Sequence, residues 1–234
     1  MKANLFLILI ITFCSGSCAL LKKSSKTEFT DAFYIQHTDS SHSKVYVDIA
    51  DDDLRVHKTV ANTHLADTSL APLIFPMVLQ DNTQMLTTFS RHTFDADVLT
   101  IPLKYRPARK GMAPQLNTNL NGALYLGYRT DLYRVNYEKS PLGKAQRNIN
   151  HFGFSVGLFT GAGNTAINTY TTTNPAMPDY DGIVWSRGIA GIIAVNRFTV
   201  GISSGYDYLL DRNRKDWMYQ NRIWYGLAFG LNLN

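Results

Sequence analysis

Five charged residues lie at alternate positions among large apolar side chains: Lys104, Arg106, Arg129, Asp131 and Asp207. Successive side chains of a β-strand point to opposite faces, so each of these residues shares a face opposite the apolar one. Unpaired charges are costly in a low-dielectric interior, and a network of ion pairs is the stable arrangement there. The sequence therefore predicts an internal charge network with a structural role.

Other residues with catalytic or ligand chemistry occur without a defining motif. Ser203, Ser204 and His151 supply hydroxyls and an imidazole, but no motif fixes their geometry. The adjacent carboxylates of 51–53 lack the glycine and the recurring oxygen ligands of a calcium loop, which favours a solvated turn. No paired spacing indicates a metal site among the histidines, which are His37, His42, His57, His64, His92 and His151. We expect no catalytic residue, metal or cofactor, since phosphate-binding and dinucleotide glycine motifs are also missing.

The element that positions such residues is clearest in the last stretch, 221–234. Every second residue there is large and apolar: Ile223, Tyr225, Leu227, Phe229, Leu231 and Leu233. After Trp224 the intervening residues are small or polar: Gly226, Ala228, Gly230, Asn232 and Asn234. A strand with an apolar outer face and small residues on the crowded inner face is typical of a membrane β-barrel.

Four residues of this strand, Trp224, Gly226, Phe229 and Leu231, resemble the C-terminal insertion signal of bacterial outer-membrane β-barrels. The chain departs from that signal by ending on Leu233 and Asn234 instead of an aromatic residue. The resemblance implies the barrel assembly machinery as a partner. The stretch from Val184 to the end also resembles uncharacterised small outer-membrane barrels of Bacteroidota, through its 205–208 and 217–221 segments. That resemblance implies location and architecture and carries no activity.

The same alternation predicts seven strands, near 95–107, 119–136, 149–161, 165–172, 182–195, 197–209 and 221–234. In the first of them, Leu99, Ile101, Leu103 and Tyr105 are expected on the outer face. Tight turns are expected at 161–164 and 196–197, and long external loops at 138–147, 174–181 and 210–220. Arg187 lies on an apolar face, so either a bulge near Gly188 turns it inward or it lies at the membrane interface. Bacterial barrels have even strand numbers, which predicts eight strands, with ten as the alternative.

The N-terminal region has a different organisation. Residues 1–17 have the layout of a secretory signal peptide, and 18–30 form a flexible tether. Cys18 follows small residues as in a lipoprotein signal and is a candidate acylation site; ordinary cleavage after Ser17 or Ala19 is the alternative. Residues 31–234 are assigned to the barrel, with an irregular segment near 51–93 that could plug or cover it. The net charge of +5 is scattered along the chain, so nucleic acid is not an expected partner.

These expectations combine into an all-β fold, an antiparallel transmembrane β-barrel of the bacterial outer membrane with its C-terminus in the periplasm. Its partners are outer-membrane lipid and, in one reading, other envelope proteins. Eight strands enclose an interior that side chains fill, so the expected function is non-enzymatic, structural or as an accessory subunit of an envelope complex. The alternatives are a small-solute channel, which needs more strands, and a lipid-modifying enzyme, which needs His151 beside a serine.

Overall fold

The computed structural model describes residues 28–38, 41–60, 63–79, 86–109, 112–141, 143–174, 176, 178–196 and 198–232. The predicted signal peptide, Cys18 and most of the predicted tether lie outside these residues. The described chain is all-β and antiparallel, as predicted, with one short 3-10 helix, η2 (Arg212–Lys215). None of its described helical residues forms a helix with the length and apolar character needed to cross a membrane.

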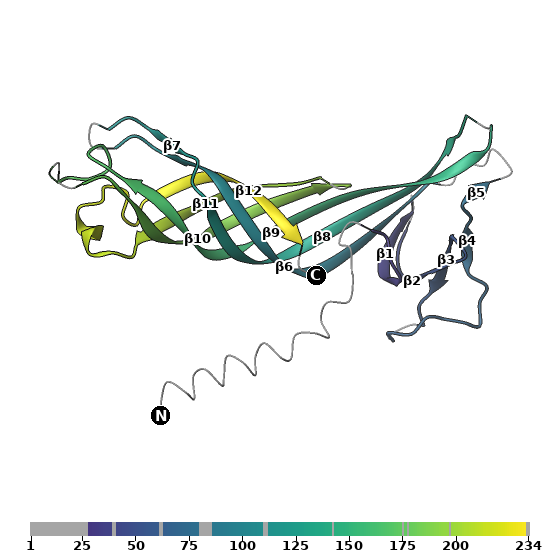
Figure 1. Ribbon diagram of the computed structural model, residues 1–234. Coiled ribbons are helices and arrows are strands. Elements are labelled where there is room, and N and C mark those ends of the chain that lie inside the picture. The colour runs from purple at the N-terminus through teal and green to yellow at the C-terminus, as the bar shows by residue number, and fades with distance from the viewer. Residues whose placement is uncertain are drawn as a thin grey trace, which may run out of the picture.

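Six long strands close into a ring, and each neighbouring pair is antiparallel (Figure 1). In ring order they are β6 (Thr87–Arg106), β8 (Asn121–Lys139), β9 (Ala145–Ile167), β10 (Tyr180–Val195), β11 (Phe198–Leu209) and β12 (Ile223–Asn232). β12 closes the ring by pairing with the second half of β6, where Tyr225 lies opposite Tyr105. The ring therefore contains six strands in the described residues, where alternation predicted seven strands and the even-number rule raised that to eight.

A second group of strands extends from one end of the ring. β1 (Ala32–Thr38) pairs with the start of β6, and β2 (Ser41–Ala50), β3 (Asp53–Lys58) and β4 (Leu73–Phe75) follow it in order. β5 (Val78–Leu79) pairs with the start of β9 at this same end, whereas β7 (Gln115–Asn117) pairs with the end of β6 at the opposite end of the ring. The segment near 51–93, expected to be irregular, thus contains three short strands and the start of β6. These strands prolong the long ones and do not enter the ring.

Two tight connections in this region follow the sequence. Thr38 pairs with Ser41 at the β1–β2 hairpin. Asp51 and Asp52 have φ angles of 54° and 67°, the left-handed values that a two-residue type I′ hairpin requires. The acidic run is a turn between β2 and β3, as expected.

The predicted turn at 161–164 is wrong, because β9 runs straight through it. A Cβ on Gly161 would lie 2.1 Å from the carbonyl oxygen of Gly122, and one on Gly163 would lie 1.8 Å from the Asn121 side-chain oxygen. These glycines allow β8 and β9 to approach closely and do not serve a chain reversal. The predicted strands at 149–161 and 165–172 therefore belong to one strand, β9, which continues to Ile167.

This continuity also corrects the predicted external loop at 138–147. β8 ends at Lys139 and β9 begins at Ala145, and register places this connection at the same end as the 196–197 turn. The long connections, which lie between β6 and β8, β9 and β10, and β11 and β12, are all at the opposite end. We call this the loop end of the ring.

The predicted faces of the first long strand are wrong in part, because β6 carries a β-bulge. Leu227 lies opposite Leu103 but Phe229 lies opposite Thr100, so two residues of β6 face one residue of β12. Pro102 has no N–H to donate to the ladder, which accounts for the bulge at this position. Leu99 and Ile101 are consequently buried inside the ring, and after the bulge Lys104 and Arg106 also face inward.

The other strands have the predicted faces, and Arg187 follows the pattern as well. Its strand keeps a continuous register on both sides, so the bulge proposed near Gly188 is not present. The Arg187 side chain lies on the outer face, with its guanidinium 4.8 Å from the centre of the Trp185 ring.

Three apolar cores follow one another along the molecule. One lies at the loop end and contains Ile167, Val184, Leu209, Trp217 and Tyr219. The second fills the ring with Leu99, Ile101, Ala123, Tyr125, Phe159, Ala190, Ile192, Trp224 and Ala228. The third joins the N-terminal strands to β6 and β8 through Phe29, Tyr34, Val45, Val47, Leu54, Val56, Phe75, Phe89, Tyr133 and Val135. Charged side chains lie where adjacent cores meet.

Candidate functional site

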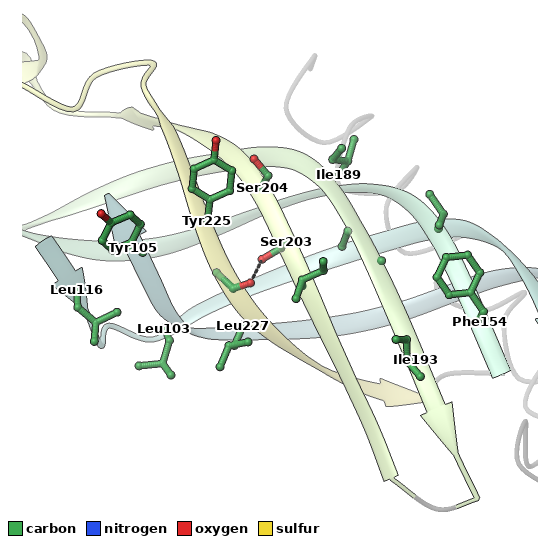
Figure 2. Close-up of a pocket in the computed structure, with 15 residues that line it drawn as sticks. Leu103, Tyr105, Leu116, Phe154, Ile189, Ile193, Ser203, Ser204, Tyr225 and Leu227 are labelled. Carbon is green, nitrogen blue, oxygen red and sulfur yellow. Dashed lines mark hydrogen bonds between the residues drawn. The ribbon is translucent and has the colours of Figure 1, made fainter. Parts of the chain in front are cut away.

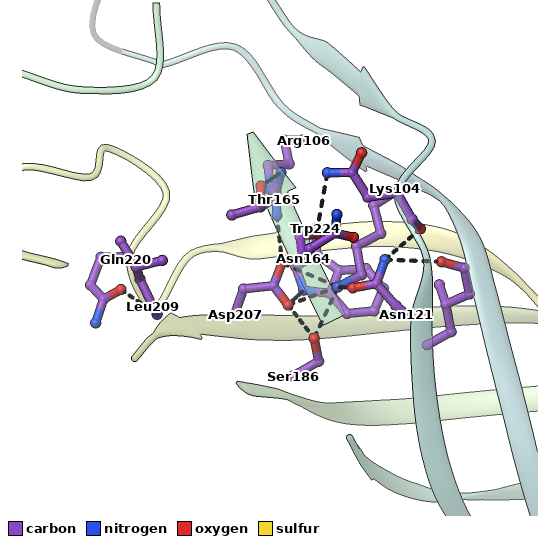
Figure 3. Close-up of polar contacts among 12 residues, drawn as sticks. Lys104, Arg106, Asn121, Asn164, Thr165, Ser186, Asp207, Leu209, Gln220 and Trp224 are labelled. Atoms are coloured by element: carbon purple, nitrogen blue, oxygen red, sulfur yellow. Dashed lines mark hydrogen bonds and ion pairs between the residues drawn. The ribbon is translucent and has the colours of Figure 1, made fainter. Parts of the chain in front are cut away.

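The first polar cluster joins β6 to the opposite wall of the ring and centres on the Asp207 carboxylate (Figure 3). Lys104 Nζ donates to Asp207 Oδ1 at 2.9 Å and to Oδ2 at 3.2 Å. The Arg106 guanidinium pairs with Oδ2, while Ser186 Oγ and Trp224 Nε1 donate to Oδ1 at 2.6 Å and 2.9 Å. Asp207 is 0% exposed and Lys104 only 2%, so both charges are removed from water and depend on these partners.

The two cations also donate to neutral side chains. Lys104 Nζ donates to Asn121 Oδ1 and Ser186 Oγ, each at 2.9 Å, and Arg106 Nη1 donates to Thr165 Oγ1 at 3.1 Å. An ammonium has three donors, and Lys104 therefore has a partner for each of them. The cluster contains two cations and one carboxylate, so it carries a formal charge of +1.

Aromatic rings bracket this cluster along the ring axis. Lys104 Nζ lies 4.4 Å from the centre of the Trp224 ring, which belongs to the core inside the ring. The Arg106 guanidinium lies 5.3 Å from the Trp217 ring and 5.4 Å from the Tyr219 ring, both in the core at the loop end. Attraction of the cations to the ring faces offsets part of the excess positive charge.

The second polar cluster lies at the other end of the ring core. Arg129 Nε donates to Asp131 Oδ1 and Oδ2 at 2.8 Å and 3.0 Å, and His151 Nε2 lies 2.7 Å from Oδ1. The His151 ring stacks on Tyr133 of the N-terminal core at 4.8 Å. A Cβ on Gly153 would lie 2.7 Å from Arg129 Nη2, so the missing side chain makes room for this cluster.

The five predicted network residues are therefore buried as expected but divide into two clusters. Lys104, Arg106 and Asp207 form one, and Arg129 and Asp131 form the other with His151. The sequence reasoning missed the part that His151 plays, although His151 has the same parity on β9 as the inward Gly153. It also missed Ser186, Asn121 and Trp224 as partners, because strand pattern does not reveal which strands face each other.

Of the residues in the predicted assembly signal, two face the inside of the ring and one faces outward. Trp224 is fully buried inside the ring, and Gly226 faces inward, where a Cβ would lie 2.6 Å from the Leu103 carbonyl oxygen. Phe229 is exposed on the outer face, and the Leu231 side chain lies outside the described residues.

The histidine and the serines that a lipid hydrolase would need do not meet. Ser203 lies opposite Ala190, which lies opposite Gly157, six residues along β9 from His151. At about 3.4 Å per residue this is a separation of about 20 Å along the strand. Ser203 Oγ instead donates to the Gly226 carbonyl oxygen at 3.2 Å. Within the described part of the chain, no three His, Cys, Asp or Glu side chains gather as metal ligands.

The outer face of the ring carries the largest exposed feature, a band of apolar side chains that covers all six strands. Its exposed members include Phe94, Tyr105, Leu124, Leu126, Tyr128, Phe152, Phe154, Val156, Leu158, Ile183, Trp185, Ile189, Ile193, Val195, Val200, Ile202, Tyr206, Ile223, Tyr225, Leu227 and Phe229. We call this set the apolar band. Monomeric soluble proteins rarely expose contiguous apolar patches of this extent.

A shallow groove of about 780 Å³ interrupts the apolar band (Figure 2). Apolar side chains such as Ile189, Ile193 and Leu227 line it, and Gly191 leaves open space where a Cβ would otherwise project. No charged side chain lines the groove, so it continues the apolar character of the surrounding face.

Comparison of the chain with protein families, with curated sequences and with solved structures finds no match.

Proposed function

We propose that this chain is a non-enzymatic β-barrel of the bacterial outer membrane, serving as a structural protein or as an accessory subunit of an envelope complex. The apolar band carries this proposal. In water, each fully exposed large apolar side chain forgoes about 1.5–3 kcal/mol of burial energy, and the band contains 21 large apolar or aromatic side chains that are 40–72% exposed. If the band lies in the hydrocarbon core of a membrane, none of these side chains is exposed to water and this cost is removed.

The dimensions of the band agree with a bilayer. Trp185, Tyr206 and Tyr225 lie toward the loop end, and Phe94, Tyr128 and Phe152 lie toward the other end. On β10 the band runs from Trp185 to Val195, about 34 Å of strand, or about 26 Å along the membrane normal at a tilt of 40°. An apolar height of about 25 Å between aromatic girdles is characteristic of outer-membrane barrels. Arg187, resting on Trp185, then lies near the interface, where a charged head reaches water.

The interior supports a structural role over transport or catalysis. Tyr125, Phe159 and Trp224 are buried at the centre of the ring, and the two polar clusters fill the spaces above and below them. Barrels of this size have an interior that side chains fill. Asp207 pairs with Lys104 and Arg106, and Asp131 pairs with Arg129 and His151, so these buried groups have their ionic partners inside the ring.

The N-terminal sheet supports the accessory role. It extends from the ring end that has the short 196–197 turn, which faces the periplasm in the predicted topology. A core of ten buried apolar residues, which it shares with the ends of β6 and β8, packs this sheet against the long strands. Such a sheet offers a surface to other envelope proteins without entering the barrel.

A substitution on the outer face tests the membrane assignment directly. Leu158 is 67% exposed, so Leu158→Arg is close to neutral if water surrounds it. In hydrocarbon, the same change costs about 2–4 kcal/mol at the midplane. We expect Leu158→Arg to lower the folded fraction in outer-membrane extracts, measured by heat-modifiable gel mobility. Tyr170→Arg, at a position 71% exposed beyond the band, is the matched control.

Two outcomes would contradict the proposal. One is equal folding of Leu158→Arg and Tyr170→Arg. The other is recovery of the wild-type protein from the periplasm without detergent.

A further inference from the structure

A pocket of about 350 Å³ opens at the loop end, directly beyond the apolar band. Its lining side chains come from the end of β11, the β11–β12 loop, the β9–β10 loop and the segment after β6: Arg109, Thr173, Tyr208, Arg214, Lys215, Asp216, Trp217, Met218, Gln220 and Arg222. Four of these are cationic and one is a carboxylate. Within the described residues, no ion pair neutralises Arg109, Arg214, Lys215 or Arg222.

The pocket is held in shape by buried groups and backbone hydrogen bonds. Trp217 is buried and forms a bridge with Thr172, and Thr173 N donates to the Asp216 carbonyl oxygen at 2.9 Å. Leu209 N donates to Gln220 Oε1 at 2.9 Å, and this bond ties the loop to the end of β11. These bonds hold the β11–β12 loop, which carries Arg214, Lys215 and Arg222, against the β9–β10 loop and the end of β11.

The charge below the pocket adds to its positive potential. Trp217 lines the pocket, and the Arg106 guanidinium lies 5.3 Å from the centre of its ring. Arg106 belongs to the buried cluster that carries a formal charge of +1. Like charges held together repel, and an anion that enters between them relieves this repulsion. Guanidinium groups also match phosphate oxygens in two-point hydrogen bonds.

The position of the pocket identifies the source of the anion. Tyr206 pairs with Ile223 at the edge of the apolar band nearest the loop end. Tyr208, two residues beyond Tyr206, and Arg222, one residue before Ile223, line the pocket. Arg214 lies with its guanidinium 5.8 Å from the Tyr208 ring. A lipid whose chains lie against the apolar band therefore has its headgroup at the level of these cations.

We propose that this pocket binds the phosphate group of an anionic lipid headgroup in the leaflet at the loop end. The inference rests on the proposed membrane function, because that function places the headgroups beside the pocket. Basic pockets at membrane interfaces attract anionic headgroups by about 1 kcal/mol per cation, or about fivefold in affinity. Removing two cations should therefore weaken the lipid preference by at least about tenfold.

The test uses the full-length mature protein in non-ionic detergent, with dimyristoyl phosphatidylglycerol and dimyristoyl phosphatidylcholine as probes. Native mass spectrometry measures how much of each lipid the protein retains. We expect the wild type to prefer phosphatidylglycerol and the Arg214→Gln/Arg222→Gln double variant to lose that preference. The control is Arg134→Gln/Lys139→Gln, which removes two exposed cations from the end of β8 that lies away from the pocket. This variant should show the same lipid preference as the wild type.

Further arms separate the alternatives. Equal retention of both lipids by the wild type, or an unchanged preference in the Arg214→Gln/Arg222→Gln variant, would overturn the proposal. If 10 mM inorganic phosphate displaces the lipid completely and binds as tightly alone, the pocket is a free-anion site and the lipid assignment fails. Should the double variant not fold, the single variant Lys215→Gln is measured in its place. Flotation of each protein with vesicles measures membrane insertion separately. A wild-type protein that floats with vesicles but shows no lipid preference contradicts the lipid-binding inference and leaves the proposed membrane function standing.

Discussion

At the scale of single residues, the Asp207 carboxylate is the group on which the ring interior most depends. Among the residues that the structure describes, it is the only carboxylate that pairs with Lys104 and Arg106, and all three side chains are buried. Removing one partner of a buried charge pair costs about 3–5 kcal/mol, because the remaining charges are left uncompensated. We therefore expect Asp207→Ala to lower the free energy of unfolding by about that amount, as measured by urea titration in detergent micelles.

The control is Asp181→Ala, which removes an exposed carboxylate of β10 and should change the free energy of unfolding by less than about 0.5 kcal/mol. A loss for Asp207→Ala no greater than for Asp181→Ala would contradict the structural role of this cluster.

A second residue-scale prediction concerns pH and the β1–β2 hairpin. Burial lowers the pKa of His37 below its usual 6.5, and the nearby His42 and His92 lower it further. Its Nδ1 lies 2.9 Å from His42 Nδ1, and its Nε2 lies 2.7 Å from Ser90 Oγ. Because the folded form binds the proton less well than the unfolded chain, the stabilisation is complete above pH 6.5. It declines as the pH falls from 6.5 toward the lowered pKa.

The measurement is an NMR titration of the His37 ring. We expect His42→Gln to raise the His37 pKa toward 6.5, since one of the opposing charges is removed. His64→Gln removes a histidine that contacts Lys44 instead, and it should leave the titration of His37 unchanged. A His37 pKa at or above 6.5 in the wild type would show that the pair does not disfavour protonation.

At the scale of elements, alternation predicted the six long strands of the ring and the faces that most of them present. It failed where a local feature changed the parity or hid the length of a strand. The bulge at Pro102 turned Leu99 and Ile101 inward, and the glycines at 161 and 163 looked like a turn while serving close packing. Both errors have one origin: the meaning of a proline or glycine in a strand depends on the neighbouring strand, which the sequence pattern does not contain.

The glycines provide the element-scale prediction. A Cβ on Gly161 would lie 2.1 Å from the backbone oxygen of Gly122, so Gly161→Ala forces β8 and β9 apart. Gly191→Ala makes the same chemical change in β10, where a Cβ would meet nothing within 4 Å. We expect Gly161→Ala to cost about 1–3 kcal/mol or more of stability, and Gly191→Ala to be neutral or slightly stabilising. Heat-modifiable gel mobility after urea titration measures both, and equal midpoints would show that the close approach is not required.

At the scale of the whole molecule, the sequence predicted the all-β antiparallel class but not which strands close the ring. Strand alternation cannot specify that β12 pairs with β6, or that β1 extends the start of β6, because pairing depends on contacts between residues far apart in the chain. The inward charges were predicted from parity alone. Their division into two clusters followed from ring geometry, since Lys104 and Arg129 lie on opposite sides of the buried Tyr125, Phe159 and Trp224 layer.

That layer decides between a structural protein and a small-solute channel. Trp224 is held by its indole hydrogen bond to Asp207, and Tyr125 by its hydrogen bond to Ser155 at 2.8 Å, so neither ring can swing aside without breaking a buried contact. The ring has six strands, fewer than any barrel size that leaves an aqueous lumen.

The purified protein should therefore show no steady ion conductance in a planar bilayer. Trp224→Ala removes the largest fully buried side chain of the ring interior, and we expect it to destabilise the fold by about 3–5 kcal/mol without opening a path, because the charged cluster remains. Reproducible single-channel steps from the wild type would mean that a continuous water path crosses the ring, and the channel function would then replace the structural one.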